Sequence, residues 1–115
     1  METTILGNTG LTVSRIGGGL AALAQESLDD LTAVEDTLAA ALDSGINFLD
    51  TAECYLDSEE MLGRAMSYRR DEFVLATKFG HTRGAGESAW GPGEIASSVE
   101  ESLRRLRTDH VDLLQ

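Results

Sequence analysis

The segment ALDSGINFLDTAECY, residues 41–55, carries the signals that decide the fold. Its first residues close a helical pattern of apolar positions, and Gly45 is a residue type that commonly ends helices. The run Ile46–Leu49 is short and apolar, which suits a buried strand. Asp50 follows at the end of that strand, and Tyr55 lies in the next loop. The segment therefore predicts a helix, a buried strand and two ionisable side chains just beyond it.

The same alternation of helix and strand extends on both sides of this segment. Upstream, we expect Ser27 to cap the first helix, with Asp29 and Asp30 in the first turn, where the helix dipole favours acidic groups. Downstream, we expect Ser58 to cap a second helix. The remaining expected elements are a strand at Phe73–Thr77, a loop at 79–92, a helix from Gly93 to about Arg107 and a strand at Val111–Leu114.

The N-terminal residues indicate a hairpin. Two short runs with strand propensity, Thr3–Leu6 and Leu11–Val13, flank the turn GNTG at residues 7–10. Arg15–Gly17 then has the pattern of a short strand that runs into further glycines. A hairpin followed by β-α-β-α-β-α-β implies an α/β fold with parallel strands and right-handed connections. Four such strands form either a small open sheet or half of an eight-stranded barrel.

The composition excludes several classes of protein. The chain has 115 residues, 42% of them apolar, and a net charge of -11. We expect no nucleic acid partner and no membrane partner, because an acidic surface repels both phosphates and anionic lipids. The N-terminus lacks the features of a signal peptide, and the single cysteine, Cys54, cannot form an internal disulfide. We expect a cytoplasmic protein.

Three ionisable residues are expected at the carboxyl edge of the sheet, where parallel α/β folds bind their ligands. Asp50 ends one strand, Tyr55 follows it, and Lys78, the only lysine, ends the next strand. Adjacent strands are about 4.8 Å apart, so Asp50 and Lys78 can form an ion pair. An ammonium beside a phenol favours proton transfer by that phenol. On spacing alone, a helix-capping Asp, a packing Tyr and a solvated Lys remain the commoner alternative.

Five segments, taken in order, resemble the aldo-keto reductase family. They are LGNTGLTVS (6–14), ALDSGINFLDTA (41–52) with Tyr55, SEEMLG (58–63), RRDEFVLATK (69–78), and SLRRL (102–106) with DHVDLLQ (109–115). The resemblance implies that residues 1–115 are the N-terminal part of an NADP-dependent oxidoreductase domain. It also implies the N-terminal half of a (β/α)₈ barrel whose lower end is plugged by the hairpin. The implied cofactor is NADPH, and the implied partner is a small-molecule carbonyl substrate.

The resemblance also assigns roles to individual residues. Tyr55 would donate a proton to the substrate carbonyl, and Lys78 and Asp50 would assist it. Gly19, Leu20 and Asp50 would lie near the cofactor, and we assign no metal-binding residue. Residues 17–22, GGGLAA, lack the third glycine of the dinucleotide fingerprint. We therefore expect these glycines to let the backbone approach the cofactor, with a tight turn as the alternative.

Some positions depart from the family pattern. Leu56 stands where a glycine commonly follows the tyrosine, and its bulk raises the prospect of a shifted Tyr55 or a narrower pocket. The family's catalytic histidine usually lies two residues beyond a glutamine such as Gln115, so we expect it outside this chain. His110 precedes its strand and cannot take that role. His81 is expected to be solvated, although it could face the pocket, and Cys54 is expected to be an inert filler.

Two further readings remain open beside the enzyme. The chain could be a half-barrel interaction module whose exposed strand edges promote self-association. It could also be an incomplete sequence whose parent protein is the enzyme, because the chain ends within an expected strand. We rank the incomplete sequence above the natural half-barrel and expect the isolated chain to be inactive.

Overall fold

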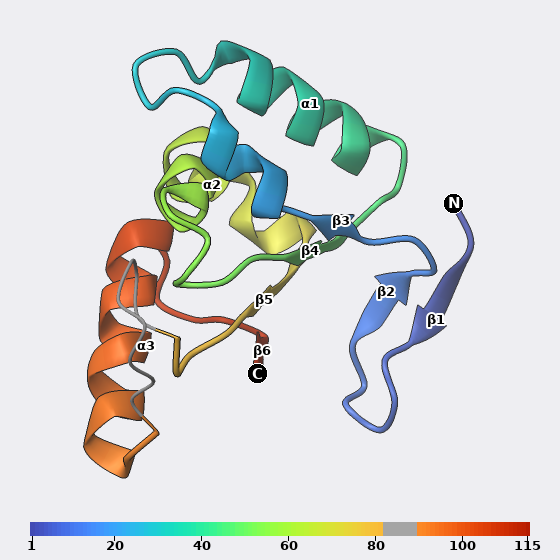
Figure 1. Ribbon diagram of the computed structural model, residues 1–115. Helices are drawn as coiled ribbons and strands as arrows, with labels where there is room; N and C mark the ends of the chain where they lie inside the picture. The colour runs from blue at the N-terminus through green and yellow to red at the C-terminus, as the bar shows by residue number, and fades with distance from the viewer. Residues whose placement is uncertain (82–89) are drawn as a thin grey trace.

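The computed structural model describes residues 1–81 and 90–115 as an α/β fold (Figure 1). In chain order the elements are β1 (Thr3–Ile5), β2 (Thr12–Ser14), β3 (Gly18–Gly19), the 3₁₀ helix η1 (Ala21–Gln25), α1 (Thr32–Asp43), β4 (Phe48–Asp50), α2 (Ser58–Met66), the 3₁₀ helix η2 (Ser67–Glu72), β5 (Val74–Thr77), α3 (Pro92–Leu106) and β6 (Leu113–Leu114).

The predicted hairpin is confirmed, with β1 and β2 paired antiparallel. It stands apart from the helices (Figure 1) and is joined to the rest of the fold by Asn47. The Asn47 side chain accepts a hydrogen bond from the Ser14 N–H at 2.7 Å and donates one to the Thr12 carbonyl at 3.1 Å. Asn47 directly precedes β4, so these bonds attach the hairpin to the amino end of the sheet.

The other four strands form one parallel sheet in the order β3-β4-β5-β6, as the alternation predicted. The first of them was placed wrongly at Arg15–Gly17, because the paired residues are Gly18 and Gly19, opposite Leu49 and Asp50. Pairing with β4 defines this strand, and a local sequence pattern carries no information about its partner.

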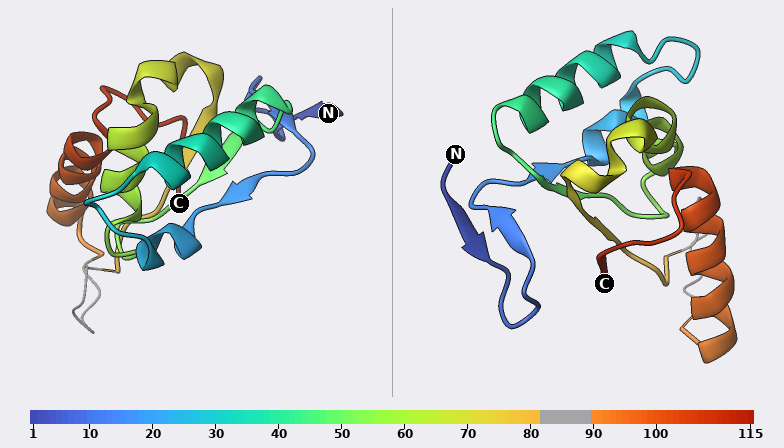
Figure 2. Two further views of the ribbon diagram at one scale, coloured as in Figure 1. Left: turned by 90° about the horizontal axis from the view of Figure 1, so that it is seen from above. Right: turned by 180° about the vertical axis from the view of Figure 1, so that it is seen from behind.

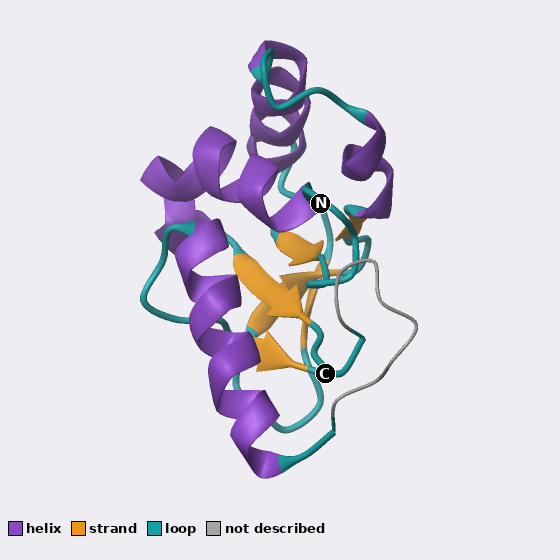
Figure 3. Ribbon diagram, turned by 60° about the vertical axis from the view of Figure 1, so that its left-hand side comes forward, coloured by secondary structure: helices purple, strands orange, loops and turns teal. Residues whose placement is uncertain are grey.

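All three α-helices pack on one face of the sheet (Figures 2 and 3). The core lies between the helices and the sheet. Leu49 and Leu75 come from the sheet, and the helices contribute apolar side chains, namely Val34, Leu38, Leu42, Leu62, Ala65, Met66 and Leu106. α2 contacts both α1 and α3. Gly63 permits the close approach of α3, since a Cβ there would lie 2.2 Å from the Arg105 carbonyl oxygen.

Both predicted helix caps are wrong. α1 begins at Thr32, and the Ser27 hydroxyl instead accepts a hydrogen bond from the Asp29 N–H within the preceding turn. Ser58 is already inside α2, and its fully buried hydroxyl lies 2.9 Å from the Thr51 hydroxyl and donates to the Leu20 carbonyl. Serine favours local turns as well as caps, so a tertiary partner decides which of its bonds forms.

The last helix and strand lie close to their predicted positions. α3 begins at Pro92, whose fixed backbone and missing N–H suit the first turn of a helix. It ends at Leu106, and the next residue, Arg107, caps it with a left-handed backbone with φ of 53°. β6 is shorter than the predicted Val111–Leu114. Most of the predicted loop at 79–92 lies outside the described residues.

Candidate active site

Asp50 and Lys78 form the predicted ion pair at the carboxyl edge of the sheet. Lys78 Nζ lies 2.7 Å from both carboxylate oxygens of Asp50 and donates a further hydrogen bond to the Thr51 carbonyl at 3.0 Å. The two side chains are about one-third exposed, at 31% and 35%. The ammonium is therefore fixed in position while both groups stay open to solvent or to a ligand.

Tyr55 lies beside this pair, as predicted. The Lys78 ammonium is placed over the Tyr55 ring, 5.2 Å from its centroid. The turn after β4 brings Tyr55 there, because the Tyr55 N–H bonds to the Ala52 carbonyl and the Ser58 N–H bonds to the Tyr55 carbonyl. The structure thus brings together the three side chains that the sequence singled out.

A pocket of about 330 Å³ opens next to the three residues. Its lining includes Tyr55 and Lys78, together with Glu53, Cys54, Phe79, His81, Trp90 and Gln115. Trp90 packs edge-on against both Phe79 and His81, with ring centroids 5.6 Å and 5.5 Å apart. One side of the pocket is therefore aromatic, and the side at Tyr55 and Lys78 is polar.

A second, more open cavity of about 470 Å³ is lined in part by Asp50. Gly17, Gly18, Gly19 and Gln115 contribute to its lining. Gln115 lines both cavities, and its amide donates a hydrogen bond to Asp50 Oδ1 at 2.9 Å. Gln115 was not among the predicted site residues, although its position at the end of the fourth strand is the signal that could have found it.

The glycines have different roles. A Cβ on Gly17 would lie 3.1 Å from the Phe48 carbonyl oxygen, and one on Gly18 would lie 3.0 Å from a Leu49 methyl carbon. These two glycines permit close packing of β3 on β4. A Cβ on Gly19 would meet nothing within 4 Å, so Gly19 remains open toward the cavity.

Leu20 is placed differently from Gly19. Its side chain is 4% exposed and belongs to the hydrophobic core. Its N–H bonds to the Asp50 carbonyl. The buried side chain and the backbone hydrogen bond of Leu20 therefore hold the end of β3 beside Asp50.

Leu56 does not line the pocket beside Tyr55, and its side chain is 54% exposed. Its backbone has a φ of 45°, in the left-handed region that favours glycine. The common glycine at this position thus has a conformational reason. Of the two prospects raised by the bulk of Leu56, a narrower pocket is not seen, because Leu56 is absent from the pocket lining.

The two histidines lie where the sequence placed them. His110 precedes β6, is exposed and contacts Asp109 through Nδ1 at 2.7 Å. His81 is exposed, yet it also lines the pocket and stacks against Trp90. Cys54 is half-buried and borders the same pocket.

The parallel sheet thus carries an Asp–Lys pair and a neighbouring tyrosine at its carboxyl edge. The sequence profile of the Aldo/keto reductase family matches residues 15–115. The chain therefore belongs to the aldo-keto reductase family.

The chain is also similar to individual proteins of this family. The chain is 39% identical over 132 residues to aldo-keto reductase YhdN of Bacillus subtilis, and 36% identical over 122 residues to L-galactose dehydrogenase of Arabidopsis thaliana. These alignments cover 100% and 99% of the chain but 37% of each relative. A crystal structure from Pseudomonas aeruginosa, assigned to the aldo-keto reductases, matches with a TM-score of 0.87 and 38% identity, covering 97% of this chain and 45% of that one.

These matches confirm the expected fold class. The chain has the structure of the N-terminal half of a (β/α)₈ barrel with a hairpin before its first strand. In such barrels the active site lies at the carboxyl ends of the strands, where Asp50 and Lys78 are found. Within residues 1–81 and 90–115, no helix is long and apolar enough to cross a membrane.

Proposed function

We propose that the full-length protein reduces aldehydes or ketones to alcohols with NADPH, and that Tyr55 donates the proton. The observation that carries this proposal is the placement of the Lys78 ammonium over the Tyr55 ring beside an open pocket. A carbonyl oxygen gains negative charge as its carbon is reduced, so it needs a proton donor at that moment. Among the described residues that line the pocket, Tyr55 is the one that bears a hydroxyl group.

Lys78 and Asp50 would support this proton transfer electrostatically. Loss of the phenolic proton leaves a negative charge on Tyr55, and a nearby ammonium stabilises that charge. Asp50 holds the ammonium through two 2.7 Å contacts and balances its charge. The arrangement is fixed before the substrate arrives, so no reorganisation is needed during the reaction.

We infer that the cavity lined by Asp50 and Gly19 would accept the nicotinamide end of the cofactor. It is open, it adjoins Asp50 and Gln115, and Gly19 presents its backbone there without a side chain. When bound, NADPH would supply the hydride for the carbonyl carbon. Of the predicted cofactor residues Gly19, Leu20 and Asp50, the two that line the cavity, Asp50 and Gly19, would contact it.

The proposal is tested by deuterium transfer. The full-length protein is incubated with aldehydes and ketones and with NADPH deuterated at the transferable position, and the alcohol is analysed by mass spectrometry. We expect one deuterium at the former carbonyl carbon. An alcohol that carries no deuterium, or no alcohol with any carbonyl compound, would contradict the proposal. The cytoplasmic location and the self-association of the isolated chain stay predictions of the sequence.

A further inference from the structure

Lys78 is flanked by two residues that are held by buried carboxylates. On one side, the Thr77 hydroxyl donates a hydrogen bond to Glu59 Oε1 at 2.6 Å. On the other side, the Gly80 N–H donates to Glu53 Oε1 at 2.9 Å. Glu59 is 1% exposed and Glu53 is 8% exposed. The short segment that carries Lys78 is thus held at both ends.

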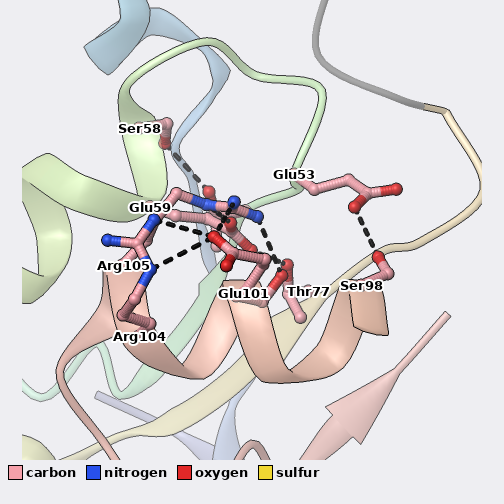
Figure 4. Close-up of polar contacts among 10 residues, drawn as sticks. Glu53, Ser58, Glu59, Thr77, Ser98, Glu101, Arg104 and Arg105 are labelled. Carbon is pink, nitrogen blue, oxygen red and sulfur yellow. Dashed lines mark hydrogen bonds and ion pairs between the residues drawn. The ribbon is translucent and has the colours of Figure 1, made fainter. Parts of the chain in front are cut away.

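The second oxygen of each carboxylate is bound by α3 (Figure 4). Arg105 Nε donates to Glu59 Oε2 at 2.7 Å, and the Ser98 hydroxyl donates to Glu53 Oε2. Figure 4 shows the two carboxylates at different points along α3, Glu59 beside Arg105 and Glu53 beside Ser98. Each glutamate therefore bridges the Lys78 segment to the same helix.

Such bridges are not expected from stability alone. Burying a carboxylate is unfavourable unless it is paired and hydrogen-bonded, and apolar residues of similar size often stabilise as well. Buried ionic groups are better known for fixing one conformation. Here two of the four bonds hold residues on either side of Lys78, whose ammonium lies over the Tyr55 ring, and the other two hold the same carboxylates on α3. The location of these bonds indicates that the two carboxylates position Lys78.

We propose that Glu53 and Glu59 form a two-carboxylate brace that fastens the Thr77–Gly80 segment to α3 and so positions Lys78 for catalysis. This inference rests on the proposed reductase function. Glu53 contributes a further link, because its own N–H bonds to the Lys78 carbonyl at 3.4 Å. The aromatic side of the pocket depends on the same brace. Gly80 has a φ of 98°, and the Trp90 ring occupies the space where its Cβ would lie.

The fold does not depend on the brace alone. The strand end at Lys78 is also held by the Phe79 N–H to the Gln115 carbonyl and by the Gln115 N–H to the Thr77 carbonyl. Removing one arm of the brace should therefore leave the sheet paired while Lys78 moves. This separation permits a test by mild substitutions that keep both carboxylates.

The test uses Thr77→Val and Ser98→Ala in the full-length protein. Thr77→Val replaces one hydroxyl of the brace by a methyl group, and Ser98→Ala removes the other hydroxyl. Ser97→Ala is the matched control, because Ser97 is the neighbouring serine of α3 and, within the described part of the chain, its hydroxyl bonds to the Gly93 and Glu94 carbonyls of the same helix. Thr77→Ser restores the donor and should rescue the Thr77→Val defect.

We expect Thr77→Val and Ser98→Ala each to lower kcat roughly tenfold to a hundredfold, the scale of a displacement near 1 Å at a catalytic group, with little change in KM. Ser97→Ala should retain the wild-type kcat. A purely structural role would lower the melting temperature and leave kcat per folded molecule unchanged. That result would overturn the proposal.

A second measurement is independent of turnover. The protein is labelled with ¹⁵Nζ-lysine, and the Lys78 resonance is assigned by its loss in Lys78→Arg. We expect the resonance to shift in Thr77→Val and Ser98→Ala and to stay in place in Ser97→Ala. If the resonance shifts but the wild-type protein reduces no carbonyl compound, the brace stands and the proposed function fails. If the resonance stays in place in both Thr77→Val and Ser98→Ala, the proposed positioning role of the brace is wrong, even if the protein is an active reductase.

Discussion

The two ends of the sheet each carry an ion pair between a basic residue and an aspartate, and the two pairs are built differently. At the amino end, Arg70 binds Asp112 at 2.7 Å and also donates to the Phe73 and His110 carbonyls. Asp112 in turn accepts the Leu75 N–H. At the carboxyl edge, Lys78 binds Asp50, and each of the two side chains lines one of the two cavities.

The difference lies in exposure and in what each pair holds. The side chains of Arg70 and Asp112 are 10% and 18% exposed, and most of their bonds go to backbone. The side chains of Lys78 and Asp50 are 31% and 35% exposed and adjoin Tyr55 and Gln115. The first pair joins segments of the chain, and the second presents charge to a ligand. Barrel folds divide stability and chemistry between their two ends in the same way.

The sharpest test of this division is Lys78→Met. We expect kcat for carbonyl reduction to fall by roughly 10²–10⁴, the usual contribution of acid–base assistance. The free energy of unfolding should fall by about 1 kcal/mol or less, because the pair is partly exposed. Steady-state kinetics and urea denaturation measure the two effects. A large loss of stability with normal kcat would reverse the roles assigned to the two ends.

The opposite result is expected for Arg70→Met. Removal of Arg70 leaves Asp112 and two carbonyl groups without their partner, which we expect to destabilise the fold by about 3 kcal/mol. The kcat per folded molecule should be close to wild type. Arg15→Met is the matched control, since the Arg15–Glu2 pair is highly exposed and should contribute little. If Arg70→Met and Arg15→Met have equal stability, the structural role of the amino-end pair is wrong.

A smaller effect is expected for Leu56→Gly. Leu56 has a left-handed backbone, and relief of that strain should stabilise the protein by about 1 kcal/mol. The Leu56 side chain is exposed and does not line the pocket, so KM should change little. Thermal unfolding and steady-state kinetics measure both quantities. A lower melting temperature would show that Leu56 contributes contacts that outweigh its strain.

The sequence predicted most of the fold because the informative signals are local. Helical spacing located α3 and the body of α1, and apolar runs located β4 and β5. The caps at Ser27 and Ser58 failed because a side chain that can cap a helix can equally bond elsewhere, and at Ser58 the competing partners come from distant segments.

The candidate site was predicted only in part, because some of its residues are identified by contacts between distant segments and not by local patterns. Asp50, Tyr55 and Lys78 each follow a recognisable strand, so their meeting at one edge could be inferred. Glu59 and Arg105 could not be recognised as buried, because both lie on helices where charged residues usually face solvent. Their burial depends on the packing of α2 against α3 at Gly63, which no local pattern reveals.

The measurement that tests the account most directly is the comparison of Tyr55→Phe with the wild-type full-length protein. The substitution removes one hydroxyl and keeps the ring beneath the Lys78 ammonium. Turnover of a carbonyl substrate and the affinity for NADPH are measured on the same preparations. In Tyr55→Phe we expect turnover to be almost lost, while the affinity for NADPH is nearly unchanged. Normal turnover in Tyr55→Phe would contradict the role of Tyr55 as proton donor.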